Sequence, residues 1–388
     1  MLHTSYIELS KSALQKNIKF LKKIIGPNVV FSSVIKGNAY GHGIKEFVPL
    51  AEECGINHFS VFSADEALLA LDNKRPKSHF CIIGSIQDEE LEWAIENDIS
   101  FYVFDNGRLN AAIEASKKAG KPAQIHLELE TGLNRTGLQR EQFHDAVDII
   151  KRNLGHLRVV GVCTHYAGAE SVNNYLRIKS QIERFNEGCQ WLTEQGLSYG
   201  LRHTACSAAT LSYPETRMDM VRIGIAQYGF WPSRETMMHY VLEHIKKGQK
   251  KVHDPLKRVM TWKSRVINVK EVQPGEFIGY GTSYQTTHTQ KIASIPIGYH
   301  HGFARNLSNL GHVLIQGKRA LVVGMVNMHV IMVDVTRLKN VERGEEVVII
   351  GTQKKATITV GSFSDLTRFQ NYEVLARLPY NIPRFIVD

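Results

Sequence analysis

The sequence lacks an apolar run approaching the roughly 20 residues that a membrane-spanning helix needs. Its first ten residues lack the apolar core of a secretory signal. It has no Cys-x-x-Cys pair, and its five cysteines are an odd number, which argues against a disulfide framework and for a reducing compartment. These absences argue against a membrane protein and a disulfide-bonded secreted domain, and we expect a cytoplasmic protein.

Nucleic-acid-binding patterns are absent as well, although the formal net charge is +9. The basic residues are dispersed, apart from a run within residues 246–258, and no zinc-finger or RNP-like pattern accompanies that run. We interpret it as a solvated linker. We expect no nucleic-acid partner, and we predict no metal site.

What the sequence does contain is an alternation of short apolar segments with helical ones. The apolar segments have the length and the β-branched content of buried strands. Eight of them occur, at residues 29–33, 59–62, 80–83, 101–103, 123–127, 159–163, 201–203 and 220–225. Eight β/α units across roughly 200 residues predict an α/β fold of the (β/α)8 TIM-barrel type. An open doubly wound sheet is the alternative, but no Gly-x-Gly-x-x-Gly motif follows the first strand.

The pattern changes after about residue 230, where short strands alternate with turns. These strands are expected at residues 260–266, 291–296, 313–316, 319–323, 330–335 and 346–350. We predict a barrel domain over residues 1–240 and a mostly β C-terminal domain over residues 241–388. The strand-like residues 1–10 are expected to pack with the C-terminal domain.

One lysine, Lys36, stands where the first barrel strand runs into a turn rich in Gly, Asn, Tyr and His. The carboxyl ends of barrel strands form the catalytic face, so a lysine there can form a Schiff base or act as a base. For a lone lysine, an ordinary solvated strand end is the commoner reading. The composition of the turn, residues 37–43, favours a chemical role.

Other polar residues follow later strands, and each alone has an ordinary explanation. Arg135, His165 and Ser207 come after the fifth, sixth and seventh of the strands that follow the first helix, and Arg222 lies on the last one, just before Gly224. A helix start at Ser207 and the free backbone N–H groups near Gly224 suit a phosphate. A lysine and a phosphate site on one barrel face together imply pyridoxal phosphate.

Two tyrosine-rich turns occur in the C-terminal region, at residues 279–284 and 298–303. A tyrosine in such a turn is often plain packing. It can also act as a general acid or base if a neighbouring cation lowers its pKa.

With these motifs in this order, residues 6–384 closely resemble the alanine racemase family, which are fold-type III pyridoxal phosphate enzymes. Lys36 corresponds to the family's cofactor lysine. Tyr280 corresponds to its second catalytic residue, in a Tyr-Gly-x-x-Tyr turn that is contributed across the interface of a homodimer. Two bases on opposite faces can remove and return the Cα proton without moving the substrate.

The resemblance also implies roles for the remaining site residues. The phosphate would be held by Tyr40, Ser207, Gly224, Ile225 and Tyr372. Arg222 would face the pyridine nitrogen with support from His165, and an arginine there should keep that nitrogen unprotonated. Arg135 would lie near the phenolic oxygen of the cofactor and the substrate carboxylate, and Met328 would also contact the substrate.

The sequence departs from the family pattern at three places. Asn327-Met328-His329 replaces a common Cys-Met-Asp, and His300-His301 replaces Ala-Asp in a Gly-Tyr-Ala-Asp-Gly turn. Two acidic residues near the substrate entrance are thereby replaced by histidine. Glu128 stands where many members carry a carbamylated lysine, and we predict that it orients Arg135.

The resemblance predicts an isomerase that interconverts L- and D-alanine and supplies D-alanine for peptidoglycan. The alternative is a racemase of another amino acid, or of a broad range, with an entrance altered at His301, Asn327 and His329. A non-catalytic pyridoxal phosphate carrier would lack the C-terminal domain. A decarboxylase of this fold usually has a cysteine in that domain, whereas no cysteine here lies beyond Cys206.

Overall fold

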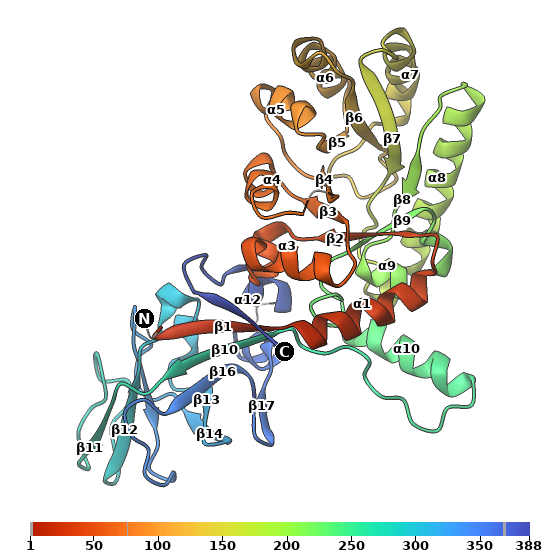
Figure 1. Ribbon diagram of the computed structural model, residues 1–388. Coiled ribbons are helices and arrows are strands. Elements are labelled where there is room, and N and C mark those ends of the chain that lie inside the picture. Colours follow the sequence, from red (N-terminus) through yellow and green to blue (C-terminus); the bar gives the residue numbers. More distant parts are fainter. Residues whose placement is uncertain (1–2, 76, 368–369) are drawn as a thin grey trace. The chain divides into compact units, whose positions relative to one another are not determined.

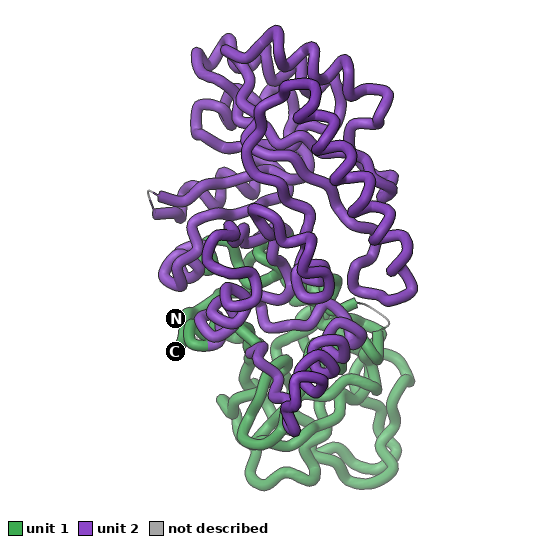
Figure 2. The backbone as a smooth tube through the Cα atoms, turned by 90° about the vertical axis from the view of Figure 1, so that its right-hand side faces the viewer, with its two compact units in different colours: residues 1–12, 37–47, 258–388 green, residues 13–36, 48–257 purple. Residues whose placement is uncertain are grey.

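The computed structural model describes residues 3–75, 77–367 and 370–388. The chain forms two compact units (Figure 2). Unit 1 comprises Met1–Ser12, Gly37–Phe47 and Arg258–Asp388, and unit 2 comprises Ala13–Lys36 and Val48–Lys257. The segment that follows Lys36 therefore belongs to a different unit from Lys36 itself.

Unit 2 is built on eight parallel strands in its described residues. They are β2 (Val30–Val34), β3 (His58–Val61), β4 (His79–Ile82), β5 (Ser100–Val103), β6 (Ala123–Glu128), β7 (Leu157–Cys163), β8 (Leu201–His203) and β9 (Met220–Ile223). The strand order is β8-β7-β6-β5-β4-β3-β2-β9. Backbone hydrogen bonds from Asp219 to Arg202 (3.1 Å) and from Arg222 to Ala205 (2.9 Å) join β9 to the β8 end of the sheet. The predicted TIM-like barrel is confirmed.

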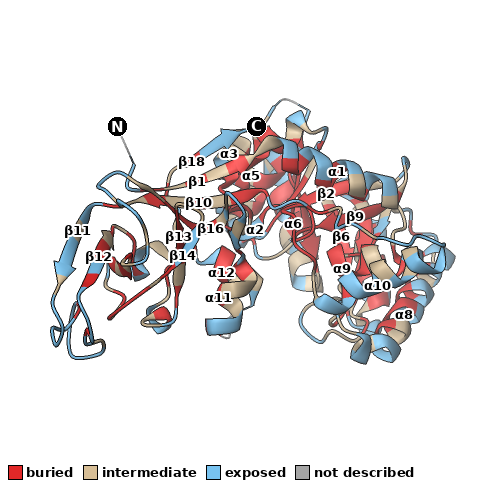
Figure 3. Cartoon of the chain, turned by 90° about the horizontal axis from the view of Figure 1, so that it is seen from below, coloured by how far each residue is buried: buried red, intermediate tan, exposed pale blue. Residues whose placement is uncertain are grey.

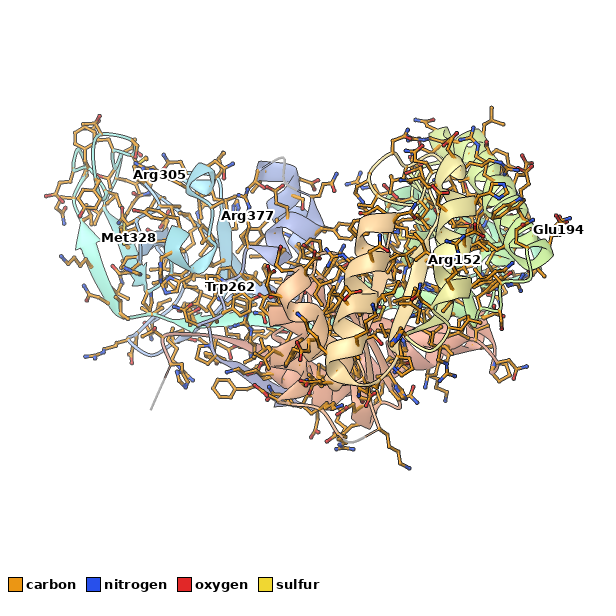
Figure 4. The ribbon with its side chains drawn as sticks, turned by 90° about the horizontal axis from the view of Figure 1, so that it is seen from above. Arg152, Glu194, Trp262, Arg305, Met328 and Arg377 are labelled. Atoms are coloured by element: carbon orange, nitrogen blue, oxygen red, sulfur yellow. The ribbon has the colours of Figure 1, made fainter. Side chains whose placement is uncertain are left out.

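Helices surround these strands (Figure 1). They are α1 (Lys11–Ile25), α3 (Ile44–Glu53), α4 (Ala64–Leu71), α5 (Leu91–Glu96), α6 (Asn106–Ala119), α7 (Phe143–Arg152), α8 (Tyr175–Glu194), α9 (Ser207–Ser212) and α10 (Arg234–Lys246). In α7 the buried residues Phe143, Ala146, Val147 and Ile150 recur at helical spacing. Arg152 on α7 and Glu194 on α8 lie on the outside of this ring (Figure 4). The apolar stripes face the strands, which are mostly buried (Figure 3).

Unit 1 is mostly β. Its strands are β1 (Ser5–Ser10), β10 (Met260–Arg265), β11 (Asn268–Val272), β12 (Gln290–Ile295), β13 (His312–Ile315), β14 (Lys318–Leu321), β15 (Ile331–Asp334), β16 (Glu346–Gln353), β17 (Ala356–Ile358) and β18 (Arg384–Val387). One sheet has the order β14-β13-β16-β10-β1-β18, with β17 beside β16, and the other has the order β11-β12-β15. Trp262 on β10 is among the largest fully buried side chains (Figure 4). The unit also contains the helices α11 (Val360–Thr367) and α12 (Asn371–Ala376).

The element α2 (Lys36–Tyr40) is a turn with left-handed backbone. Short 3₁₀ helices complete the described elements. They are η1 (Asp88–Glu90), η2 (Arg140–Gln142), η3 (Val172–Asn174), η4 (Pro214–Thr216), η5 (Tyr299–His301) and η6 (Arg305–Leu307). No helix in the described ranges is long and apolar enough to cross a membrane.

Several elements differ from the sequence predictions. The helix α10 runs through the predicted boundary after residue 240, and both sides of that position belong to unit 2. The strands β11, β17 and β18 and the helices α11 and α12 were not predicted. Residues 1–10 were expected to pack with the C-terminal domain, and β1 lies between β10 and β18. The parallel pairing of β1 with β18 joins opposite ends of the chain, so local periodicity carries no signal for it.

Candidate active site

Lys36 lies two residues after the end of β2, and the end of this strand is held by buried hydrogen bonds. The carbonyl of Val34 accepts hydrogen bonds from the Gln227 side-chain amide (3.1 Å) and from the Tyr228 hydroxyl (2.9 Å). The Ser33 hydroxyl donates to the Gln227 side-chain carbonyl at 2.7 Å. Gln227 was not among the predicted site residues, because a lone glutamine after a strand carries no signal of burial.

The turn after Lys36 winds in the left-handed sense. The φ angles are 62° at Gly37, 53° at Asn38, 52° at Ala39 and 51° at Tyr40. Left-handed backbone costs a non-glycine residue roughly 1–2 kcal/mol, so the structure must hold this turn against strain. The Asn38 carbonyl accepts from the amide of Gly43 (2.9 Å), and its side-chain oxygen accepts from the amide of Ile44 (3.0 Å).

Two further residues of the turn explain how it is held within unit 1. The buried His42 ring places Nδ1 at 3.0 Å from the Ala39 carbonyl and 2.9 Å from the Tyr40 carbonyl. Carbonyl oxygens only accept, so Nδ1 carries the proton. Gly41 has a φ of 75°, and a Cβ there would lie 2.1 Å from the carbonyl oxygen of Leu375. Only glycine fits this close approach.

The pKa of Lys36 is lowered. Part of its side chain is exposed, yet the protein atoms crowded around it are the largest cause, followed by the positive charge of Arg135. Glu66 opposes the shift, and Arg222 adds to it. Because a neutral amine is the nucleophile and the base, this environment favours the reactive form of the lysine.

Arg222 is buried on β9 and has all of its terminal N–H groups committed. Its Nη1 donates to the ring nitrogen Nδ1 of His203 (2.6 Å) and to the His203 carbonyl (2.7 Å). Its Nη2 donates to the carbonyls of Thr164 (2.7 Å) and Thr204 (3.1 Å), and lies 3.5 Å from His165 Nδ1. Among the described residues the remaining donor, Nε–H, has no protein acceptor. It is therefore available to a ligand.

His165 is partly buried just after the end of β7. Burial lowers its pKa to about 3, and the charges of Arg222, Arg135 and Lys36 act in the same direction. The ring is therefore neutral at working pH, and its Nδ1 can accept from Arg222. The buried Gln181 donates to the His165 carbonyl at 3.1 Å and accepts from the amide of Ala167 at 2.8 Å. Gln181 is a second supporting residue that sequence analysis did not single out.

Ser207 and Gly224 come together as the sequence predicts. The Ser207 hydroxyl accepts from the amides of Gly224 (3.0 Å) and Ala226 (3.4 Å), and Ser207 is the first residue of α9. Ile225, between these two amides, is buried. The amides of Gly224 and Ala226 are thus engaged by Ser207, whose hydroxyl keeps a proton that it can donate to an oxygen of a phosphate.

Glu128 and Arg135 are the loosest part of the site. Burial raises the pKa of Glu128, while the Thr136 hydroxyl and the charges of Arg222 and Arg135 lower it. Arg135 is exposed, and in the described part of the chain it makes no ion pair with Glu128. Their interaction is a through-space one here, so the predicted orientation of Arg135 by Glu128 stays a prediction.

The remaining predicted site residues belong to unit 1. The rings of Tyr40 and Tyr372 lie 6.0 Å apart, centroid to centroid. Tyr280 is 76 % exposed, between Gly279 (φ 72°) and Gly281 (φ 71°) in the turn that connects β11 and β12. The amide of Ile278 donates to the Tyr284 carbonyl at 3.0 Å and closes this turn.

Met328 belongs to a second turn of unit 1, and it is half exposed (Figure 4). The amides of Tyr299 and His300 donate to the carbonyls of Asn327 and Met328, both at 3.1 Å. A Cβ on Gly298 would lie 2.1 Å from the Asn327 oxygen, so this contact requires glycine. The pairing also gathers three imidazole rings, of His300, His301 and His329, whose centroids are 4.8–5.5 Å apart.

Both parts of the chain match models of one protein family. Residues 9–232 match the alanine racemase N-terminal domain, and residues 259–386 match the alanine racemase C-terminal domain. The chain therefore belongs to the alanine racemase family, a family of isomerases.

Individual relatives agree along the whole chain. An alanine racemase of Leptospira interrogans is 35 % identical over 388 residues, covering 100 % of this chain and 96 % of the relative. One from Methanococcus maripaludis is 33 % identical, covering 98 % of each. A crystal structure of alanine racemase from a D-cycloserine-producing Streptomyces lavendulae superposes with a TM-score of 0.89 at 29 % identity, covering 100 % of this chain and 98 % of the other.

Proposed function

We propose that this protein is a pyridoxal phosphate-dependent racemase that interconverts L- and D-alanine in the cytoplasm and supplies D-alanine for peptidoglycan. Membership of the family supports the reaction class. The observation that carries the assignment is the convergence of Lys36, with its lowered pKa, and Arg222, with one uncommitted donor, at the carboxyl ends of adjacent strands. The five cysteines are free thiols, in keeping with a reducing compartment.

The residues of unit 2 fit pyridoxal phosphate. The Nζ atom of Lys36 would bond the aldehyde carbon, and the turn of Ser207, Gly224 and Ile225 would receive the phosphate. Arg222 Nε–H would donate to the ring nitrogen, with His165 beside it. A guanidinium only donates, so a pyridine nitrogen that accepts its hydrogen bond stays unprotonated. In unit 1, the hydroxyls of Tyr40 and Tyr372 would complete the phosphate site.

When bound, the cofactor withdraws electrons from the substrate Cα and makes its proton acidic. Lys36 Nζ would then take or return that proton on one face, and the Tyr280 oxygen would do so on the other. Arg135 would hold the substrate carboxylate through its guanidinium. Met328, beside the Asn327 carbonyl, would contact the substrate from unit 1.

Tyr280 would reach the site from a second copy of the chain. Its exposure at the tip of a turn suits a residue that completes the site of a partner. We therefore propose a homodimer in which each active site contains Lys36 of one chain and Tyr280 of the other.

A racemase of a different amino acid, or of a broad range, is the second candidate. The observation that favours it is the imidazole cluster of His300, His301 and His329 beside Met328. Burial lowers the pKa of His301, and the other two imidazoles add to this shift. His301 is therefore largely neutral near pH 7, and the cluster presents ring nitrogens to a substrate side chain.

The two candidates are separated by one assay. The purified protein, loaded with pyridoxal phosphate, is incubated with a panel of single L-amino acids, and the D-enantiomer is quantified for each. We expect turnover of alanine to exceed that of every other amino acid. Faster turnover of a polar amino acid would select the second candidate, and no turnover of any amino acid would reject both.

A further inference from the structure

A chain of buried polar groups runs from Arg222 through the interior of the barrel. Arg222 Nη1 lies 2.6 Å from His203 Nδ1. His203 Nε2 lies 2.9 Å from His126 Nδ1, and His126 Nε2 lies 3.2 Å from the Ser100 hydroxyl. That hydroxyl donates to the Phe80 carbonyl at 3.3 Å. The members come from β9, β8, β6 and β5, and the four side chains themselves are buried.

Arg222, the first member, determines which ring nitrogen of each histidine in this chain carries the proton. A guanidinium only donates, so His203 Nδ1 must accept. A neutral His203 then carries its proton on Nε2 and donates to His126 Nδ1. His126 in turn carries its proton on Nε2 and donates to Ser100, whose hydroxyl ends the chain on a carbonyl. All the donors therefore point away from Arg222.

Burial keeps both imidazoles neutral. His126 and His203 are at most 2 % exposed. Burial is the largest cause that lowers the pKa of each, to about 3 for His126 and well below the ordinary value for His203, and the charge of Arg222 acts in the same direction on both. The opposite proton order would set an N–H of His203 against an N–H of Arg222 at 2.6 Å. Only one proton order is compatible with the observed distances.

We propose that His126 and Ser100 are positioning residues for the reaction, because they fix the proton of His203 on Nε2 and so keep its Nδ1 as the acceptor that holds Arg222. This inference rests on the proposed function, in which Arg222 Nε–H faces the ring nitrogen of pyridoxal phosphate. With Nη1 and Nη2 committed, the guanidinium has one orientation and presents only Nε–H. A residue two hydrogen bonds away thus aims the donor at the cofactor.

The test compares His126→Leu, which removes the acceptor, with His126→Asn, whose side-chain oxygen can replace Nδ1. The matched control is His156→Leu, which removes a histidine outside this chain whose Nδ1 lies 3.3 Å from the Ser116 hydroxyl. The readouts are ¹⁵N shifts of histidine-labelled protein, with His203 assigned by its substitution, and the dissociation constant of pyridoxal phosphate. When His203 carries its proton on Nδ1, one N–H of Arg222 Nη1 loses its acceptor and the guanidinium loses its fixed orientation. One unpaired buried donor corresponds to about a tenfold loss of affinity for the cofactor.

We expect His203 protonated on Nε2 in the wild type, a loss of that signature and about tenfold weaker cofactor binding in His126→Leu, and recovery in His126→Asn. Ser100→Ala should move both readouts in the same direction by less, and it serves if His126→Leu does not fold. A wild-type His203 protonated on Nδ1, or variants that leave both readouts unchanged, would overturn the proposal. The position of the His203 proton is measured without turnover, so an inactive wild type would reject the proposed function separately.

Discussion

The two residues proposed as catalytic bases have opposite surroundings. Lys36 follows a buried strand, and hydrogen bonds from Gln227 and Tyr228 fix the carbonyl of Val34 at the end of that strand, two residues before Lys36. Tyr280 is 76 % exposed in a turn that is closed by the Ile278–Tyr284 backbone hydrogen bond and by the Asn309 side-chain amide, which donates to the Ser283 carbonyl at 3.1 Å. The environment of Lys36 is thus built by the same unit that carries it, whereas that of Tyr280 must be completed from outside its turn.

This contrast shows how one chain can divide the work of an active site. The barrel supplies Arg222 and Ser207, whose side chains are hydrogen-bonded to neighbouring segments of the barrel, and it fixes the end of the strand before Lys36. The turns of unit 1, at residues 279–284 and 298–302, present side chains outward on short backbone scaffolds. A second copy of the chain is the partner that would convert such exposed side chains into part of a site.

The largest expected effect comes from removing Lys36, the base that follows a buried strand. Lys36→Ala should abolish covalent cofactor binding and lower racemisation by at least about 10²–10⁴-fold, because one group is both the anchor and a base. The measurements are the absorbance of the bound cofactor and the rate of D-alanine formation. Lys16→Ala, an exposed lysine on α1, is the control and should leave both unchanged.

The second prediction tests whether the exposed base works on a partner chain. Lys36→Ala and Tyr280→Phe should each be nearly inactive, but a dimer containing one chain of each has one site with both intact residues. Activity should therefore reappear when the two variants are unfolded, mixed and refolded together. Mixtures that stay inactive while wild-type protein survives the same treatment would place both bases in one chain.

Third, Gln227→Ala should lower the stability of the protein, because it removes hydrogen bonds at the end of the strand before Lys36. It leaves the buried Ser33 hydroxyl without its acceptor at 2.7 Å, which costs about 1–3 kcal/mol of stability. The free energy of unfolding in urea measures this cost. Gln190→Ala removes only an exposed hydrogen bond to Glu194 and should change stability by less than about 0.5 kcal/mol.

The smallest expected effect concerns pH. The Lys36 amine must lose its proton before it can bond the cofactor, so capture of pyridoxal phosphate by cofactor-free protein should rise with pH through the pKa of Lys36. Arg135 lowers that pKa, so Arg135→Gln should move the midpoint of the rise to higher pH. The midpoint is compared with that of Arg140→Gln, since Arg140 is an exposed arginine on η2. A midpoint that does not move would show that Arg135 has no electrostatic effect on Lys36.

The sequence located the barrel strands to within a few residues, because each is a short apolar run bounded by turns. It also located Lys36, Ser207 and Arg222 near strand ends, where parallel strands bring side chains to one face. It missed β18, since a strand beside β1 is defined by its partner and not by its own pattern. It also gave no sign that Glu128 would lack an ion pair with Arg135, because that depends on side-chain direction.

By itself, the sequence determined the β/α alternation, the mostly β second part, and which polar residues lie at strand ends, since these follow from periodicity and chain order. Only the tertiary structure decided how those residues are held. Gln227, which follows the neighbouring strand β9, supports the strand end before Lys36, and His203 and His126 order the protons behind Arg222. The partners in these contacts are up to about 190 residues apart, and hydrogen-bond geometry between distant residues exists only after the strands have assembled.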